Sequence, residues 1–379
     1  MAMKPMTLTN IVMSLSLLLV GCGTTHPETT GPSATSSPSS SSPPPTSSHR
    51  GSTTPSSPST SHSSQSTASW QFGPMDFITT NTGWVVARKV SSTGQWLSQA
   101  IFRTQNGGQS WTRLHEWNHT APMPVPRNAQ SGGIPPIASL NFQNANAGAA
   151  VIFLGAGACQ AGYGILTTTN GGNHWILQTQ SILMGEDGPL GISYPSTSSA
   201  WLANGSCAGA YTTLFHSTDG GQQWSRALNL KTNNPSPASV SFHFTSPTTG
   251  YLVNGVNGYQ KTDPSLMLYT TADGGRHWTA DTLPSRGLPD IIAGLSFVTP
   301  HQGWAIAANL NHSFHVYHLL HTGTWSALRT PEPSSATPPT LDLVNSDVAY
   351  LSQQHGTGGT LWKTVDGGSH WSKLPFPTP

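Results

Sequence analysis

An eight-residue phrase that recurs along the chain limits what this sequence can fold into. The phrase reads Ser/Thr-x-Asn/Asp-Gly-Gly-x-x-Trp, and five good copies occupy 104–111, 168–175, 217–224, 271–278 and 364–371. A reduced copy at 321–325 precedes the last one, and the six tryptophans lie 64, 49, 54, 47 and 46 residues apart. Spacing of this kind predicts one supersecondary unit repeated six times.

A second phrase precedes each copy of the first and supplies the other half of the unit. It consists of an apolar strand, a polar turn and then a small residue followed in most copies by an aromatic one, as in Phe77 to Gly83-Trp84. Each unit therefore predicts four antiparallel strands, which for the fourth unit span 240–244, 250–254, 266–270 and 277–281. We predict an all-β, six-bladed β-propeller of four-stranded antiparallel blades over 70–379, in preference to seven blades.

The residues of the repeated phrase have structural roles that follow from turn chemistry. The Asn or Asp side chain accepts backbone N–H groups, the paired glycines adopt the positive φ that the turn needs, and the tryptophan anchors the blade. We expect structural roles, not catalysis, for Asn106, Trp111, Asn170, Trp175, Asp219, Trp224, Asp273, Trp278, Asp366 and Trp371.

Charged residues are scarce, and this scarcity excludes several classes of function. Only 8% of the 379 residues are charged and the formal net charge is +1. Nucleic-acid capture needs a clustered basic face, so no nucleic-acid partner is expected. Helical bundles and coiled coils are excluded as well, because Glu, Lys, Arg and Leu supply too little of the chain.

The N-terminus predicts export and lipid attachment. An apolar run at 11–20, too short to span a bilayer, reads as the core of a signal peptide over 1–21. Leu19-Val20-Gly21-Cys22 resembles a bacterial lipobox, which implies cleavage before Cys22 and lipidation of its sulfur. Residues 22–69 then form a Ser/Thr/Pro tether without an apolar core, so the protein is expected to be extracytoplasmic and anchored to a bacterial membrane.

The repeated phrase resembles the Asp-box, or BNR repeat. Together with the Gly-Trp or Gly-Tyr pairs, it makes 70–379 similar to the photosystem II assembly/stability factor family and to sortilin-type and xyloglucanase-type propellers. The first resemblance implies a lipid-anchored or lumenal protein that binds a membrane-protein assembly intermediate. That family has seven blades and an arginine-rich patch, whereas this chain has six repeats and nine scattered arginines. A relative used outside photosynthesis is therefore expected.

Two aspartates are the candidate catalytic residues. Sialidases carry Asp-boxes too, but the inner strands here lack the arginines that such chemistry requires. Those strands place Asp76, Ser139, Ser193, Ser241, Ser296 and Asp342 at one equivalent position. Asp76 and Asp342 become neighbours when the ring closes, and a glycoside hydrolase needs such a carboxylate pair. The alternative, which we favour, is that both replace the serines as polar groups near the axis.

Cysteines and histidines carry smaller hypotheses. Cys159 and Cys207 fall in matching loops of adjacent blades outside the cytoplasm, so a disulfide between them is predicted. Histidines recur at every third position at 312, 315, 318 and 321, but on a strand this spacing alternates faces and no metal site is expected. No cofactor is expected either.

Recognition is expected to depend on neutral groups. Trp96, Trp117, Tyr163 and Tyr259 fall in predicted loops, where exposed rings suit a protein or carbohydrate face, the alternative being loop packing. The sequence favours a monomeric, noncatalytic propeller that binds an unidentified protein at the membrane or cell surface as an assembly or scaffold factor. A glycan-binding or glycoside-hydrolase propeller is the alternative.

Overall fold

The computed structural model describes a set of ranges that covers most of the repeat array. They are 68–127, 129, 133–157, 160–179, 183–185, 189–205, 211–231, 239–256, 264–289, 291–308, 313–331 and 338–379. The predictions on the signal peptide, Cys22 and the tether up to residue 67 lie outside these ranges, as do those on Cys159, Cys207, Tyr259 and His312. The described residues contain no helix of the length and apolarity needed to cross a membrane.

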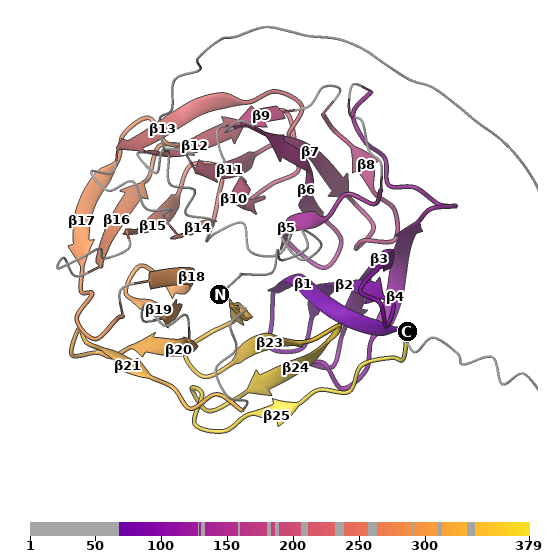
Figure 1. Ribbon diagram of the computed structural model, residues 1–379. Helices are drawn as coiled ribbons and strands as arrows, with labels where there is room; N and C mark the ends of the chain where they lie inside the picture. Colours follow the sequence, from indigo (N-terminus) through magenta and orange to yellow (C-terminus); the bar gives the residue numbers. More distant parts are fainter. Residues whose placement is uncertain are drawn as a thin grey trace, which may run out of the picture. The chain divides into compact units, whose positions relative to one another are not determined.

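Six antiparallel sheets are arranged around a common axis (Figure 1), and each is built from consecutive strands. Blades 1 to 3 comprise β1 (Ser69–Phe77), β2 (Gly83–Val90), β3 (Trp96–Thr104), β4 (Thr112–Asn118); β5 (Ile137–Phe142), β6 (Gly148–Gly157), β7 (Gln160–Thr168), β8 (Ile176–Leu177), β9 (Leu183–Gly185); and β10 (Pro189–Ser193), β11 (Ala200–Gly205), β12 (Tyr211–Ser217), β13 (Ser225–Lys231). Blades 4 to 6 comprise β14 (Ser239–Phe244), β15 (Gly250–Val256), β16 (Ser265–Thr271), β17 (Thr279–Leu283); β18 (Ile291–Thr299), β19 (Gln302–Ala308), β20 (Phe314–Leu319), β21 (Trp325–Ala327); and β22 (Thr340–Leu343), β23 (Ala349–His355), β24 (Gly358–Thr364), β25 (Ser372–Lys373). The predicted six-bladed propeller is confirmed, with β9 as an additional strand that pairs with β7.

The ring closes through the innermost strands. Each of β1, β5, β10, β14, β18 and β22 contacts the innermost strands of both neighbouring blades, and β22 contacts β1. Within the described ranges no strand is exchanged between blades, because every sheet takes its strands from one continuous stretch of chain. The seam between blades 6 and 1 therefore depends on side chains and on the chain end rather than on a shared sheet.

Stacked aromatic rings fill the joints of blades 1 and 2, 3 and 4, and 6 and 1. There the ring at the start of the second strand stacks on a phenylalanine in the first strand of the next blade, with 3.6 Å between the ring centroids of Trp84 and Phe142, 3.9 Å for Trp201 and Phe244 and 3.4 Å for Tyr350 and Phe77. Trp175, from the repeated phrase of blade 2, meets Phe142 edge-on at 5.9 Å. The glycine before the aromatic residue is needed because a Cβ on Gly83, which precedes Trp84, would overlap the Phe77 ring of the same blade.

The repeated phrase forms the same turn in all five good copies. In blade 3 the Ser217 hydroxyl donates to Asp219 Oδ1 (2.8 Å) and accepts the N–H of Gly221 (2.8 Å). Asp219 Oδ1 also accepts the N–H of Gln223 (2.9 Å). The paired glycines have positive φ in every copy, at 75° and 99° in blade 3. These bonds are the ones that turn chemistry predicts for the phrase.

Each of these turns also fixes its blade to its surroundings. The N–H of the first glycine donates to the turn between the first two strands of the same blade, as Gly274 does to the Thr248 carbonyl (2.8 Å). The second glycine lies against the preceding blade, where a Cβ on Gly275 would be 2.7 Å from the Trp201 ring. The repeated turn therefore contributes to the joints between blades as well as to its own sheet.

Candidate functional site

A belt of polar side chains joins the innermost strands around the axis. In each joint a side chain near the end of one innermost strand accepts a backbone N–H near the end of the innermost strand of the next blade. The axial belt consists of six side chains, each of which accepts one backbone N–H of the next blade. Asp76 accepts from Phe142 (2.5 Å), Asn141 from Tyr194 (2.8 Å), Ser193 from Phe244 (3.1 Å), Ser241 from Phe297 (3.2 Å), Ser296 from Leu343 (3.1 Å) and Asp342 from Phe77 (2.6 Å). All six joints are thus linked by a side chain that accepts a backbone N–H.

The predicted equivalence of six positions on the innermost strands is wrong in two blades. Asp76 pairs with the residue that follows the first glycine of the second strand. In blade 2 the residue in this position is Asn141 rather than Ser139, and in blade 4 it is His243 rather than Ser241. The error in blade 4 arises because Phe242 and Phe244 both fit the phrase, and only Phe244 pairs with Gly250. Ser139 and Ser241 still bridge to the next blade, through the N–H groups of Ile192 and Phe297.

Asp76 and Asp342 are the two carboxylates of the belt. Asp342 in β22 accepts the N–H of Phe77, the residue that follows Asp76 in β1, so the two groups are consecutive links. Both are half-buried. Burial raises the pKa of Asp76 to about 7. The hydrogen bonds from the N–H of Phe142 and the amide of Asn141 lower this pKa but do not cancel the effect of burial. Burial and then the charge of Asp76 raise the pKa of Asp342 well above its ordinary value.

The bonds of this pair describe its chemistry. Asp76 uses one oxygen for the N–H of Phe142 and the other for the Asn141 amide (3.4 Å). Asp342 uses Oδ2 for the N–H of Phe77. Ser193 and Ser296 make the same kind of link with hydroxyl groups, which identifies joining blades as a shared task of these positions. The pair can hold a proton at neutral pH, which is the property required of a general acid.

A basic side chain covers the aromatic ring of the second strand in several blades, and the sequence analysis missed this feature. Arg103 lies over Trp84 at 5.1 Å, and Lys363 lies over Tyr350 at 5.2 Å while donating to the Thr80 carbonyl (3.1 Å). His216 stacks on the ring of Trp201 at 3.9 Å. The available signal was the basic residue directly before the repeated phrase.

Arg88 is a buried cation that sequence reasoning also missed. Its guanidinium donates to Gln99 Oε1 (3.2 Å) and to the Ile137 carbonyl (3.2 Å), and it lies over the Trp96 ring at 4.6 Å. Desolvation lowers the pKa of Arg88 to about 10. These bonds hold the point at which the chain enters blade 2, so its evident role is to position β5.

The aromatic residues Trp96, Trp117 and Tyr163, predicted to lie on loops, do not form an exposed face. Trp117 and Tyr163 lie on strands β4 and β7 and are buried, with 2% and 1% of their surfaces accessible, so the loop placement is wrong for both and the packing alternative is confirmed. Trp96 is half-buried at the start of β3. Among the described residues, no group of three or more His, Cys, Asp or Glu side chains is arranged to hold a metal ion.

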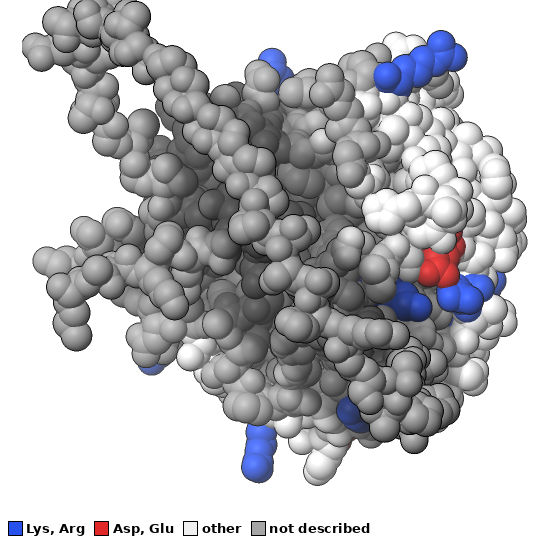
Figure 2. All heavy atoms as spheres, turned by 45° about the vertical axis from the view of Figure 1, so that its right-hand side comes forward, with Lys and Arg blue, Asp and Glu red and all other residues white. Residues whose placement is uncertain are grey.

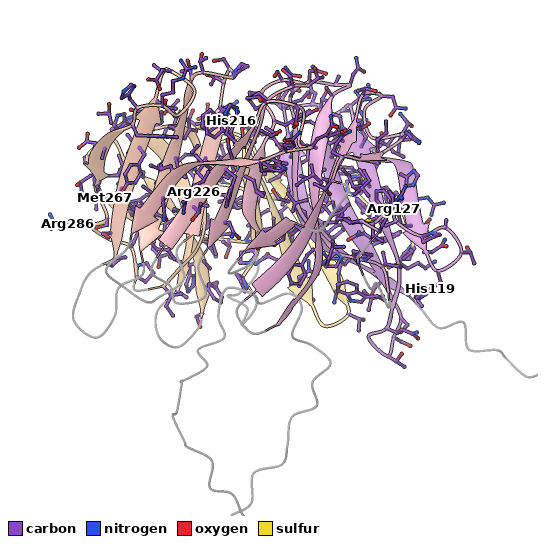
Figure 3. All side chains as sticks on the ribbon, turned by 90° about the horizontal axis from the view of Figure 1, so that it is seen from above. His119, Arg127, His216, Arg226, Met267 and Arg286 are labelled. Carbon is purple, nitrogen blue, oxygen red and sulfur yellow. The ribbon has the colours of Figure 1, made fainter. Side chains whose placement is uncertain are left out.

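Charged groups are dispersed over the described surface. Figure 2 shows basic side chains standing apart from one another on one face. Arg127, Arg226 and Arg286 lie at separate places along the side of the ring (Figure 3). Figure 2 shows no large clustered basic patch among the described side chains of its view, in keeping with the low charge of the sequence.

Fold and site together define a six-bladed β-propeller whose blades are joined by an axial polar belt and by repeated Asp/Asn-Gly-Gly turns. No protein-family model matches the chain, and no curated protein matches it, so the resemblance to the Asp-box and photosystem II factor families stays a prediction.

Solved structures similar to the chain are β-propellers. A GH74 enzyme from Niastella koreensis is 16% identical, with a TM-score of 0.46 over 81% of this chain and 45% of that one. The chain therefore spans about half the length of that enzyme. The lectin of Aleuria aurantia, in complex with Fucα1-6GlcNAc, is 11% identical, with a TM-score of 0.48 over 83% and 97%. A Hadza microbial sialidase is 12% identical, with a TM-score of 0.47 over 78% and 66%.

Proposed function

We propose that the propeller is a noncatalytic glycan-binding module, held outside the cytoplasm by a lipid on Cys22. The observation that carries the proposal is the composition of its surface. The exposed groups of the described residues are mainly hydroxyls, amides and imidazoles, which donate and accept hydrogen bonds without net charge. Sugars present the same kind of groups, so a neutral polysaccharide matches this surface.

The described surface gives less support to the protein scaffold favoured by the sequence. Interfaces between proteins depend on a few large anchors, chiefly Trp, Tyr and Arg, in a patch that loses water on binding. All thirteen tryptophans are described here and none is exposed. The exposed large hydrophobic residues of the described ranges are Ile176, Leu320 and Val365, on blades 2, 5 and 6. An apolar anchor patch is therefore not built from these residues.

Glycan binding is expected to be insensitive to salt. The lipidated chain, solubilised in nonionic detergent, should be retained on at least one of insoluble cellulose, chitin or starch. Retention should change less than about twofold between 50 mM and 1 M NaCl, because screening acts on charged groups. Cosedimentation measures it, with de-esterified pectin as a charged control matrix. Absence of retention on every neutral matrix, or its loss in high salt, would contradict the proposal.

A glycoside hydrolase is the second candidate, because Asp76 and Asp342 combine proximity with raised pKa values. Such an enzyme would release reducing sugar from a bound glycan, and Asp76→Asn or Asp342→Asn would lower kcat by about 10³-fold or more. The noncatalytic proposal predicts that wild-type protein releases none above a blank. Release by the wild type that both variants lose would establish the enzyme instead.

Membrane attachment is expected to depend on one thiol. Cys22→Ala should abolish incorporation of radiolabelled palmitate and move the protein from the membrane pellet to the soluble fraction, because no acyl chain is then attached. Labelling and fractionation in a bacterial host measure both effects. Cys159→Ala is the control and should retain the label. Unchanged membrane association of the Cys22→Ala protein would overturn the lipid anchor.

A further inference from the structure

The seam between blades 6 and 1 is the place where the axial belt carries charge. Four of the six links use an amide or hydroxyl oxygen, from Asn141, Ser193, Ser241 and Ser296. The other two are the carboxylates Asp342, which holds blade 6 to blade 1, and Asp76, which holds blade 1 to blade 2. Both carboxylates therefore act on β1, the strand at which the ring closes.

An amide performs this task in the same protein, so the carboxylates are not required by geometry. Asn141 occupies in β5 the slot that Asp76 occupies in β1, and its Oδ1 accepts the N–H of Tyr194 at 2.8 Å. The N–H that Asp76 accepts lies at 2.5 Å. What the carboxylates add to the joint is the capacity to gain or lose a proton, which neither an amide nor a hydroxyl has in this pH range.

Among the residues that the structure describes, the groups that face the pair direct no positive charge at it. Asp76 pairs across β1 and β2 with Trp84, and across the next joint it meets the amide of Asn141. Asp342 pairs with Tyr350 on β23, whose hydroxyl donates to the Thr80 carbonyl. Lys363 on β24 is directed elsewhere, because its Nζ bonds to the carbonyls of Thr80 and Gly107.

We propose that closure of the propeller at the seam of blades 6 and 1 is a proton-dependent joint. While the Asp76–Asp342 pair holds a proton, the pair carries at most one negative charge, and both carboxyl groups keep their hydrogen bonds to the neighbouring blade. When that proton passes to water as the pH rises, two negative charges share consecutive links of one strand and weaken the joint. The ring is therefore held most firmly in mildly acidic surroundings.

The sign of the effect follows from the direction of the pKa change. The pKa of Asp76 is about 7 in the folded protein and 3.8 is its ordinary value, so the folded state holds more protons than the unfolded state between these limits. Stability then falls as pH rises through this window and is flat above it. Burial lowers the pKa values of His216 and His318, and these groups oppose the trend, so the test must compare variants.

The experiment measures thermal unfolding of the full lipidated chain in detergent from pH 3 to pH 9, for the wild type, Asp76→Asn, Asp342→Asn and the double variant. At pH 8 each single variant should melt about 5 °C or more above the wild type. At pH 4 the melting temperatures of variant and wild type should differ little. The variant's melting temperature minus that of the wild type should then rise between about pH 4 and pH 7.

Two matched variants control the interpretation. Asn141→Asp adds a third carboxylate to the belt and should lower the melting temperature at pH 8 more than at pH 4. Asp281→Asn removes an exposed carboxylate in β17 of blade 4, which accepts the N–H of Thr282. Because Asp281 lies outside the belt, the difference in melting temperature from the wild type should not rise between about pH 4 and pH 7.

Two results would overturn the proton-dependent joint. One is a pH-independent difference between the wild type and both asparagine variants. The other is destabilisation of both variants at pH 8, which would show that the charged carboxylates strengthen the seam. Because asparagine already serves in this slot at Asn141, failure of the variants to fold would count as the second result.

Discussion

Gly275→Ala is expected to lower the free energy of unfolding by about 3 kcal/mol. Gly275 is the second glycine of the blade 4 turn, with φ at 79°, a backbone conformation that costs an L residue about 1–2 kcal/mol. An added Cβ would lie 2.7 Å from the Trp201 ring, which is fully buried and also stacked between His216 and Phe244. The ring cannot move without disturbing the joint of blades 3 and 4, so overpacking adds to the backbone cost.

Two glycines separate the backbone cost from the packing cost. Gly94 has φ at 84° with no atom within 4 Å of an added Cβ, so Gly94→Ala measures the backbone cost alone, about 1 kcal/mol. Gly274→Ala, in the same turn as Gly275, places a Cβ 3.5 Å from the Pro247 carbonyl and should fall between the two. Urea unfolding at pH 5 measures all three. Equal losses at Gly94 and Gly275 would show that the glycine does not serve the joint between blades.

The repeated turn could be predicted from the sequence because its bonds are local. The bonds of Ser217 and Asp219 join residues that are at most four positions apart, so the eight-residue phrase alone determines the conformation of the turn. Spacing of the phrase then determines the number of blades, and closure follows because a single four-stranded sheet cannot bury both faces. The positive φ of the paired glycines could be predicted for the same reason, whereas the packing of the second glycine against the preceding blade, as at Gly275 and Trp201, could not.

The belt and the joints could be predicted only in part, because they depend on contacts between residues 47 to 265 positions apart. Ser241 and His243 are two residues apart and lie on the same face of β14, so the alternation of side chains cannot tell which of them pairs opposite Tyr251. The sequence placed Asp76 and Asp342 in matching slots, but their burial and mutual influence arise only in the closed ring. Trp117 and Tyr163 were misplaced because strands β4 and β7 extend beyond the repeated phrases that guided the prediction.

The chain end supplies the remaining closure of the seam. Phe376 follows the last strand of blade 6, but its ring packs edge-on against two rings of blade 1. Its ring centroid lies 4.7 Å from that of Phe102 and 4.8 Å from that of Phe72. The Trp70 indole donates to the Pro377 carbonyl at 2.9 Å. Because no strand of blade 6 comes from the N-terminal end of the array, these contacts replace the strand exchange that would otherwise link the two ends.

Removal of residues 376–379 is therefore expected to destabilise the propeller by about 3 kcal/mol, from the lost burial and edge-on ring contacts of Phe376 and the lost bond of Trp70. Urea unfolding of the truncated chain measures the loss. Removal of Thr378 and Pro379 alone is the control, because both are exposed and Pro377 still presents an oxygen to Trp70. Gly94 lies outside these contacts, so a chain that combines the truncation with Gly94→Ala should show the sum of the two separate losses in unfolding free energy, within about 0.5 kcal/mol. An equal and small effect of both truncations would mean that side-chain links of the belt and the contacts between β1 and β22 suffice to close the ring without the chain end.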